Sequence, residues 1–110
     1  MALPHARTGE LIDLAPLGAK ISSAVSTALI KTPHLEAMRL VLHAGKTMSE
    51  YKLAGEVTVL CIEGQVELTL HGRVQTLRAG HWVYLLGGEP HALHAIQDSA
   101  LLLTVLLNQS

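Results

Sequence analysis

The side chains that could carry chemistry in this sequence are mainly imidazoles. Five of its seven histidines lie between residues 43 and 94, and Glu50 and Glu56 fall in the same region. Imidazole and carboxylate groups together suit iron, manganese, nickel and zinc. An imidazole can also act as a general acid or base, because its unperturbed pKa is about 6.5. The pattern indicates a metal site or acid–base chemistry, provided that some of these groups converge.

Strand geometry limits which histidines can meet. His94 comes three positions after His91, so on one extended strand the two side chains point to opposite faces. His71 and His81 belong to predicted turns, where both are expected to be solvated. His43 ends a predicted strand, and it is the remaining histidine that could share a site with His91.

The single cysteine is predicted to be inert. Cys61 lies inside an apolar strand pattern, Val57-Thr58-Val59-Leu60-Cys61-Ile62. A free cysteine in such a strand is usually buried and unreactive. One cysteine excludes an internal disulfide, and residues 1–14 have no continuous apolar stretch of the kind a secretory signal needs. These features predict a cytoplasmic protein.

Short strands separated by glycine turns are predicted to carry these residues. The predicted strands are 24–32, 35–43, 56–62, 65–71, 73–78, 82–86, 91–97 and 100–107. Strands of this length and spacing are typical of a sandwich or barrel. Residues 1–22 are predicted to be an irregular arm that leans on the barrel and holds at most one short strand, at Leu11-Ile12. The sequence therefore predicts one all-β domain, with the barrel over 23–110.

Composition bears on the partners of this domain. Charged residues make up 15% of its 110 residues, apolar residues make up 49%, and the net charge is −1. Charged residues are usually about 25% of a soluble domain. The strand at 101–107 is apolar on both faces, so we expect the core to cover one face and a second subunit the other. The sequence predicts a homodimer, with no basic stripe for nucleic acid and no span for a membrane.

From Met38 to Leu107 the sequence resembles the cupin family. Cupins carry two motifs, Gly-x5-His-x-His-x3–4-Glu-x6-Gly and Gly-x5-Pro-x-Gly-x2-His-x3-Asn. Gly45 and Gly64 match the ends of the first motif, and Gly80, Gly88 and His91 match the second. The resemblance implies a single antiparallel cupin barrel, of the double-stranded β-helix or jelly-roll type. It also implies a site inside that barrel.

The same resemblance implies that the metal site is degenerate. The family's two His positions hold Tyr51 and Leu53, and its Glu position holds Val57. The Asn position holds Ala95, so His91 is the one ligand that is clearly retained. We therefore expect no metal cofactor. The alternative is one divalent ion (Zn, Mn, Fe or Ni) held by His91 with His43 and Glu56 as non-standard ligands.

Several functions are compatible with these residues. The favoured one is a metal-poor cupin that binds a small organic molecule, as a sensor, carrier or accessory protein, in a pocket lined by His91, Tyr51, Leu53, Val57 and Ala95. The alternatives are a metal-dependent dioxygenase, isomerase or decarboxylase, a metal-free enzyme with Tyr51 and His91 as acid and base, and a purely structural dimer. Trp82 and Tyr84 share one strand face, which could line either the pocket or the subunit contact.

Overall fold

The computed structural model describes residues 5–51 and 55–107, with side chains for all of these except 49–51. Within those ranges the chain forms nine strands and one short 3₁₀ helix. In chain order they are η1 (Gly18–Ser23), β1 (Thr27–Lys31), β2 (Leu35–Leu42), β3 (Thr47–Tyr51), β4 (Val57–Glu63), β5 (Gln65–Leu70), β6 (Arg73–Arg78), β7 (Trp82–Leu85), β8 (His91–Ala95) and β9 (Ser99–Leu106). The described residues contain no helix long and apolar enough to cross a membrane.

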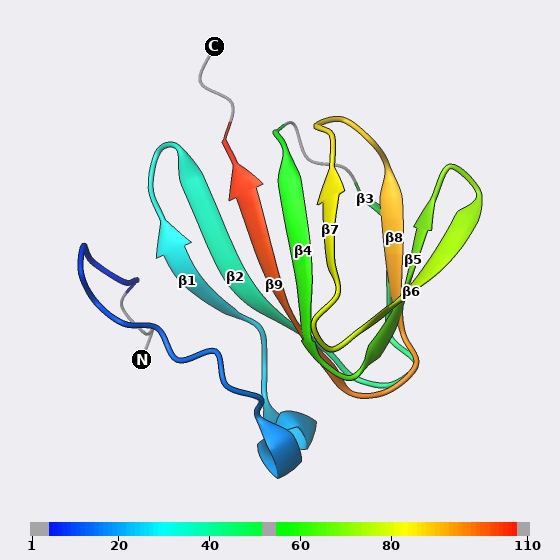
Figure 1. Cartoon of the computed structure of the whole chain (residues 1–110), viewed down its shortest axis with the longest axis horizontal. Helices are drawn as coiled ribbons and strands as arrows, with labels where there is room; N and C mark the ends of the chain where they lie inside the picture. Colours follow the sequence, from blue (N-terminus) through cyan, green and yellow to red (C-terminus); the bar gives the residue numbers. More distant parts are fainter. Residues whose placement is uncertain (1–4, 52–54, 108–110) are drawn as a thin grey trace.

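The strands form two antiparallel sheets that enclose one core (Figure 1). One sheet has the order β1-β2-β9-β4-β7, and the other has the order β3-β8-β5-β6. Strands that are distant in sequence lie side by side in both sheets, with β9 between β2 and β4, and β8 between β3 and β5. This long-range antiparallel pairing is characteristic of jelly-roll folds. The predicted all-β antiparallel barrel is confirmed.

Aliphatic side chains fill the space between the sheets. Alternate residues of each strand point inward, as Val57, Val59 and Cys61 do from β4, and these three are buried. The same cluster contains Leu40, Leu42, Val66, Leu68, Leu77, Leu85, Leu93, Ala95, Leu101, Leu103 and Val105. The chain has no phenylalanine, so branched aliphatic residues supply the volume of this core.

The turn between β4 and β5 requires glycine for two separate reasons. Gly64 is the single residue between these strands, and its φ of 92° lies in the left-handed region that residues with a Cβ rarely adopt. A Cβ at this position would also clash with the Ser99 side chain at the start of β9. The glycine that closes the first family motif therefore lets β4 and β5 pass close to β9.

One strand, β3, was not predicted from the sequence. β3 is an edge strand that pairs only with β8 among the described strands, and its sequence, Thr-Met-Ser-Glu-Tyr, is largely polar. An edge strand with one neighbour needs no continuous apolar pattern, so its residues resemble those of a loop. The other eight strands lie where they were predicted, with ends that differ by up to three residues.

The N-terminal arm differs from its predicted form. Residues 5–26 contain no strand, so the short one allowed for at Leu11-Ile12 does not form, and they do contain η1, which was not predicted. The Glu63 carboxylate accepts hydrogen bonds from the backbone N–H groups of Leu17 (2.6 Å) and Gly18 (3.1 Å). These bonds join the start of η1 to the end of β4. A contact between residues 45 positions apart gives no periodic signal in the sequence.

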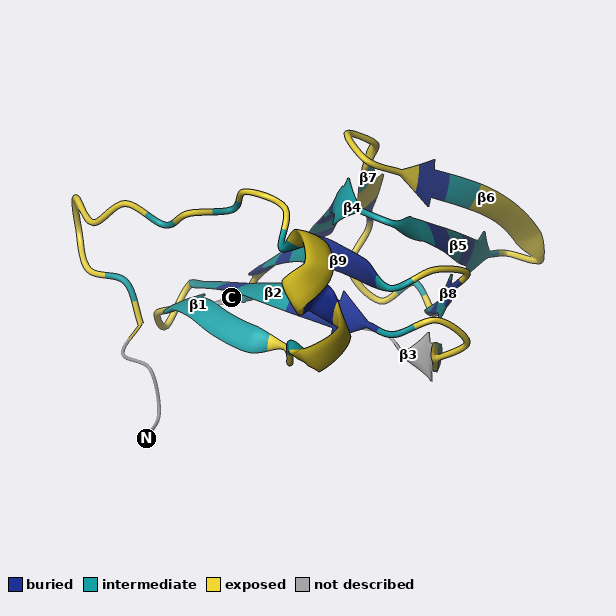
Figure 2. Cartoon of the chain, turned by 90° about the horizontal axis from the view of Figure 1, so that it is seen from below, coloured by how far each residue is buried: buried dark blue, intermediate teal, exposed yellow. Residues whose placement is uncertain are grey.

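The outer face of β9 is covered partly by the chain itself. Ile21 of η1 packs with Val41 and Ala100 in a second buried cluster, separate from the main core, and η1 lies at the end of the sheet where β2 ends and β9 begins (Figure 1 and Figure 2). Further along β9, Leu102 is half-buried and Leu106 is 48% exposed. The core therefore covers the inner face of β9, and η1 covers one end of its outer face. The rest of that outer face is more open.

Candidate ligand site at the barrel end

His91 is the first residue of β8 and faces the interior of the barrel. It lies on the same strand face as the buried Leu93 and Ala95, and its own side chain is only 3% exposed. Among the buried side chains that the structure describes, only those of His91 and Ser99 are polar. Ser99 lies at the β4–β5 turn, where its hydroxyl bonds the backbone of Gln65 and Gln97. The aliphatic core therefore carries an imidazole at one end.

The hydrogen bond at Nδ1 determines which ring nitrogen of His91 carries the proton. Nδ1 lies 3.2 Å from the backbone carbonyl oxygen of Glu89. A carbonyl oxygen can only accept, so Nδ1 must be the donor. In the neutral ring Nε2 is then the nitrogen with the lone pair. This tautomer presents an acceptor, or a base, at Nε2.

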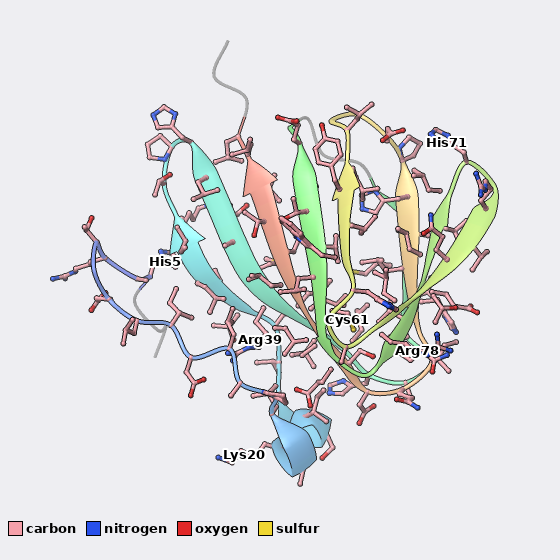
Figure 3. The ribbon with its side chains drawn as sticks, viewed as in Figure 1. His5, Lys20, Arg39, Cys61, His71 and Arg78 are labelled. Atoms are coloured by element: carbon pink, nitrogen blue, oxygen red, sulfur yellow. The ribbon has the colours of Figure 1, made fainter. Side chains whose placement is uncertain are left out.

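Glu89 joins three parts of this end of the barrel, although no motif in the sequence indicated a role for it. Its carbonyl holds the His91 ring, and its carboxylate accepts from the Leu86 backbone N–H (3.0 Å) and pairs with His71 Nε2 (2.8 Å). Figure 3 shows His71 at the turn between β5 and β6. Glu89 thus makes one hydrogen bond within the β7–β8 loop, to Leu86, and one contact with the neighbouring β5–β6 hairpin, at His71.

The Glu89 contacts predict a change of stability in acid. The hydrogen bond from His71, and then that from Leu86, hold the pKa of the Glu89 carboxyl below its ordinary value. A carboxyl group whose pKa is lower in the folded protein than in the unfolded chain stabilises the folded state when the pH is above the unfolded pKa. This stabilisation is lost as the pH falls through the folded pKa. We expect the thermal midpoint to fall on acidification from about pH 5 more steeply in the wild type than in Glu89→Gln. Equal slopes in melting curves recorded between pH 3 and pH 6 would contradict this role.

Tyr51 is the backbone partner of His91. The register of β3 and β8 pairs the backbones of these two residues directly. The Tyr51 side chain and Leu53 lie outside the described part of the structure. Val57 and Ala95, the other two residues of the predicted pocket, are 2% and 0% exposed and belong to the core cluster. The structure therefore has aliphatic side chains at two of the positions where the family has polar ones.

The two non-standard ligands of the alternative metal site do not converge on His91. His43 follows β2 at the opposite end of the barrel, and its Nε2 lies 3.2 Å from the Ile21 carbonyl oxygen on the outer side. Glu56 is exposed, and its carboxylate accepts a hydrogen bond of 2.5 Å from the Tyr84 hydroxyl. The neighbouring carboxylate raises the pKa of that hydroxyl. His43 comes directly after the inward-facing Leu42 of β2, and Glu56 directly before the inward-facing Val57 of β4, so strand alternation directs both side chains away from the interior.

The remaining histidines lie on the surface side of their strands and turns. His71 and His81 are exposed, and His81 Nδ1 accepts from the Arg78 backbone N–H (2.9 Å). His94 is half-buried on the outer face of β8, where its Nδ1 lies 2.6 Å from Thr47 Oγ1. Cys61 is 1% exposed, and burial raises the pKa of its thiol. These placements agree with the expectations from strand alternation.

Trp82 and Tyr84 lie on the outer surface of the barrel. Their side chains are 71% and 53% exposed, whereas Val83 and Leu85 between and after them pack on the core. Of the two predicted locations, the structure excludes the interior pocket for this pair.

A shallow hollow of about 220 Å³ adjoins His91. It is lined by Thr69, His71, Gly72, Pro90, His91 and Ala92, where the β5–β6 turn meets the start of β8. Thr69 and Ala92 are cross-strand neighbours on the outer face of the sheet. The hollow therefore approaches His91 from the rim of the barrel, beside the His71–Glu89 pair.

The described residues do not form a donor set for a divalent metal. No group of three or more His, Cys, Asp or Glu side chains within 5–48 and 55–107 could hold an ion. A firmly bound transition metal needs several ligands that converge on one point. Of the three other positions where the family has metal ligands, only the side chain of Val57 is described, and it is aliphatic. The residues around His91 in the core therefore do not fit a cofactor of this kind.

Comparison with known structures places the barrel in a fold class. The chain resembles a cupin superfamily protein from Desulfitobacterium hafniense DCB-2, with a TM-score of 0.77 and 19% identity over 94% of this chain and 100% of that one. It also resembles the conserved SPY1581 protein of unknown function from Streptococcus pyogenes, with a TM-score of 0.76 and 19% identity over 100% of this chain and 97% of that one. The chain thus has a jelly-roll barrel of the cupin type, as its motif glycines predicted.

Enzymes also share this fold. The salicylate 1,2-dioxygenase from Pseudaminobacter salicylatoxidans matches with a TM-score of 0.68 and 17% identity, over 73% of this chain and 25% of that one. No protein-family model matches the sequence, and no curated protein matches it significantly. At these identities the likeness shows the cupin fold, and function must be argued from the site.

Proposed function

We propose that this protein binds a small organic molecule at the His91 end of its barrel, without a tightly bound catalytic metal, in a sensor, carrier or accessory role. The observation that supports the proposal most is the imidazole of His91, 3% exposed at the end of an aliphatic core. A few polar groups on an apolar wall are typical of small-molecule sites. The described neighbours of His91 supply that wall, but not a second metal ligand.

The tautomer of His91 indicates what the ligand should carry. With Nδ1 donating to the Glu89 carbonyl, Nε2 is an acceptor, and it suits a hydroxyl or N–H group on the ligand. The inward-facing residues beside it, Leu93 on β8 and Leu70 on β5, are aliphatic. We therefore propose a small, largely apolar molecule with one hydrogen-bond donor. Tyr51, the cross-strand partner of His91, is the second residue that we propose for this site.

Binding is expected to depend on Nε2 of His91. His91→Asn retains an N–H donor for the Glu89 carbonyl but removes the Nε2 acceptor. Small neutral fragments, each with one O–H or N–H donor, should shift the amide resonances of Ala92 and Leu93 in ¹H–¹⁵N spectra of the wild type. In His91→Asn we expect the affinity of these fragments to fall about tenfold, as for the loss of one hydrogen bond from a buried site.

His94→Ala is the matched control, because His94 lies on the same strand with its side chain on the outer face. It should bind the fragments as the wild type does. Fragments that bind His91→Asn as tightly as the wild type, or that bind only away from β8, would contradict the proposed site.

A further inference from the structure

A second hollow lies at the corner where β6 turns into β7. These two strands are edge strands of different sheets, and Figure 1 shows them diverging from the short turn that joins them. The hollow between them has a volume of about 270 Å³ and is lined by Gln75, Thr76, Leu77, His81, Trp82 and Val83. It shares no residue with the hollow beside His91. The corner therefore offers a separate surface to a ligand.

Backbone hydrogen bonds to β4 hold the shape of this corner. The Cys61 N–H donates to the His81 carbonyl oxygen (2.8 Å), and the Gly80 N–H donates to the Cys61 carbonyl oxygen (2.8 Å). Gly80 supplies the φ of 90° in the turn, which a residue with a Cβ rarely adopts. Leu77 belongs to the buried core, and Val83 packs against that core. The walls are thus largely formed before a ligand arrives, which lowers the cost of binding.

Trp82 gives the hollow a large apolar wall that is in contact with water. Its side chain is 71% exposed. The face of an aromatic ring carries partial negative charge, so it attracts the slightly positive C–H groups of a molecule that stacks on it. A pyranose ring has such a face, because several of its C–H groups point to one side while its hydroxyl groups surround the edge. An exposed indole therefore suits a sugar ring, provided that partners for the hydroxyl groups lie beside it.

Three polar side chains of the same hollow can bond hydroxyl groups. The Gln75 amide and the Thr76 hydroxyl can each donate and accept, and neither side chain is hydrogen-bonded to the part of the chain that the structure describes. His81 Nδ1 accepts from the Arg78 backbone N–H (2.9 Å), so in the neutral ring Nε2 carries the proton and can donate. The hollow thus holds both donors and acceptors, which is the combination that hydroxyl groups need.

The charge and size of the hollow narrow the class of ligand. None of its six lining side chains has a fixed charge, and His81 is the one titratable group among them. A neutral molecule therefore fits better than a phosphate, a carboxylate or an amine. Sites for drug-sized molecules begin at roughly 300 Å³, so this hollow suits a single ring. An aromatic ring would also stack on Trp82, but it would leave the polar groups of Gln75 and Thr76 unused.

We propose that the corner between β6 and β7 binds a neutral sugar, with one pyranose ring stacked on Trp82. Gln75, Thr76 and His81 then bond the hydroxyl groups of that ring. The proposal is supported by an exposed indole and three uncharged polar side chains that share one hollow. Their spacing in the sequence does not reveal the site, because β6 and β7 belong to different sheets. The site is independent of the ligand proposed for His91.

The sole tryptophan makes binding at this corner directly measurable. The probes are the methyl pyranosides of glucose, galactose and mannose, added separately. We expect at least one of them to change the fluorescence of Trp82 along a saturating curve, with a dissociation constant of about 1 mM. The same sugar should shift the ¹H–¹⁵N resonances of Thr76 and Val83. Sorbitol, which has hydroxyl groups but no ring to stack, should do neither at equal concentration.

The contacts are tested by variants whose binding is followed through the Val83 resonance. Trp82→Ala should weaken the pyranoside roughly tenfold or more, and Gln75→Ala about threefold to tenfold. Tyr84→Ala is the matched control, because Tyr84 is an exposed aromatic residue on the same face of β7 (53% exposed) that does not line the hollow. It should bind as the wild type does. Circular dichroism would verify that the variants retain their β structure.

Three pyranosides that leave both signals unchanged, at about ten times the expected dissociation constant, would overturn the proposal. A sugar that binds Trp82→Ala as tightly as the wild type, or that Tyr84→Ala weakens equally, would overturn it as well. Phenol tests the aromatic alternative. If phenol shifts the Thr76 and Val83 resonances and no pyranoside does, the hollow takes aromatic molecules and the assignment to sugars is wrong.

Discussion

A protein carrying Tyr51→His, Leu53→His and Val57→Glu together is expected to retain close to one equivalent of zinc, manganese, iron or nickel after dialysis. The substitutions restore the ligand types of the family motif, while His91 already faces the interior from β8. Val57 faces the same core from β4, so a glutamate there would be directed inward. Tight binding needs several ligands that converge with support from surrounding groups. The wild type should retain far less than one equivalent.

Val57→Glu alone is the matched control for this experiment. Val57 is 2% exposed, so its replacement by an unpaired carboxylate should cost on the order of several kcal/mol of folding free energy. Added zinc should raise the melting temperature of the triple variant, by mass action on the folded state, and leave that of the single variant nearly unchanged. A wild-type protein that copurifies with a full equivalent of metal, measured by elemental analysis, would overturn the proposal of a metal-poor site.

Leu101→Ala is expected to lower the free energy of unfolding by about 2–5 kcal/mol, because it leaves a cavity in close-packed surroundings. Leu101 is 0% exposed in β9, the strand at the centre of the five-stranded sheet, and its Cα is paired with Leu40 on β2 and with Cys61 on β4. Few neighbours can move to fill the space, since both adjacent strands are held by ladder hydrogen bonds. Urea unfolding followed by circular dichroism measures the change.

Leu11→Ala is the control for that change. Leu11 is fully exposed in the arm, so the same truncation there should alter stability by no more than about 0.5 kcal/mol. A small effect of Leu101→Ala, comparable with that of Leu11→Ala, would show that β9 is not packed as the structure describes. The pair separates the cost of a core cavity from any general effect of losing a leucine.

The fold could be predicted because its determinants are local and repeated. Period-two alternation in β4 and β5 and the glycines between strands are visible in the sequence, and they determine which residues face inward. β3 could not be predicted in the same way, because an edge strand with polar residues has the composition of a loop. The short helix η1 gave no signal either, since it depends on Glu63, a residue far away in the sequence.

The candidate site was predicted only in part. Strand alternation predicted that His91 and His94 face opposite sides of the sheet. The family motif made Tyr51 a candidate residue, and its backbone is paired with that of His91. Glu89 was overlooked because its role depends on contacts with His71 and with the ring of His91, which no spacing reveals. The outward placement of His43 and Glu56 likewise required the actual strand faces.

A β-barrel with glycine turns and an aliphatic core could be inferred from the residues alone, because burial and turn geometry act residue by residue along each strand. Which distant strands become neighbours could be seen only in the folded chain. That pairing placed Trp82 beside Leu60 and Leu102 on an outer face, and it brought Glu89 between His71 and His91 at the barrel end. The physical reason is that cross-strand and cross-loop contacts join residues far apart in the chain, and their geometry exists only once both sheets have formed.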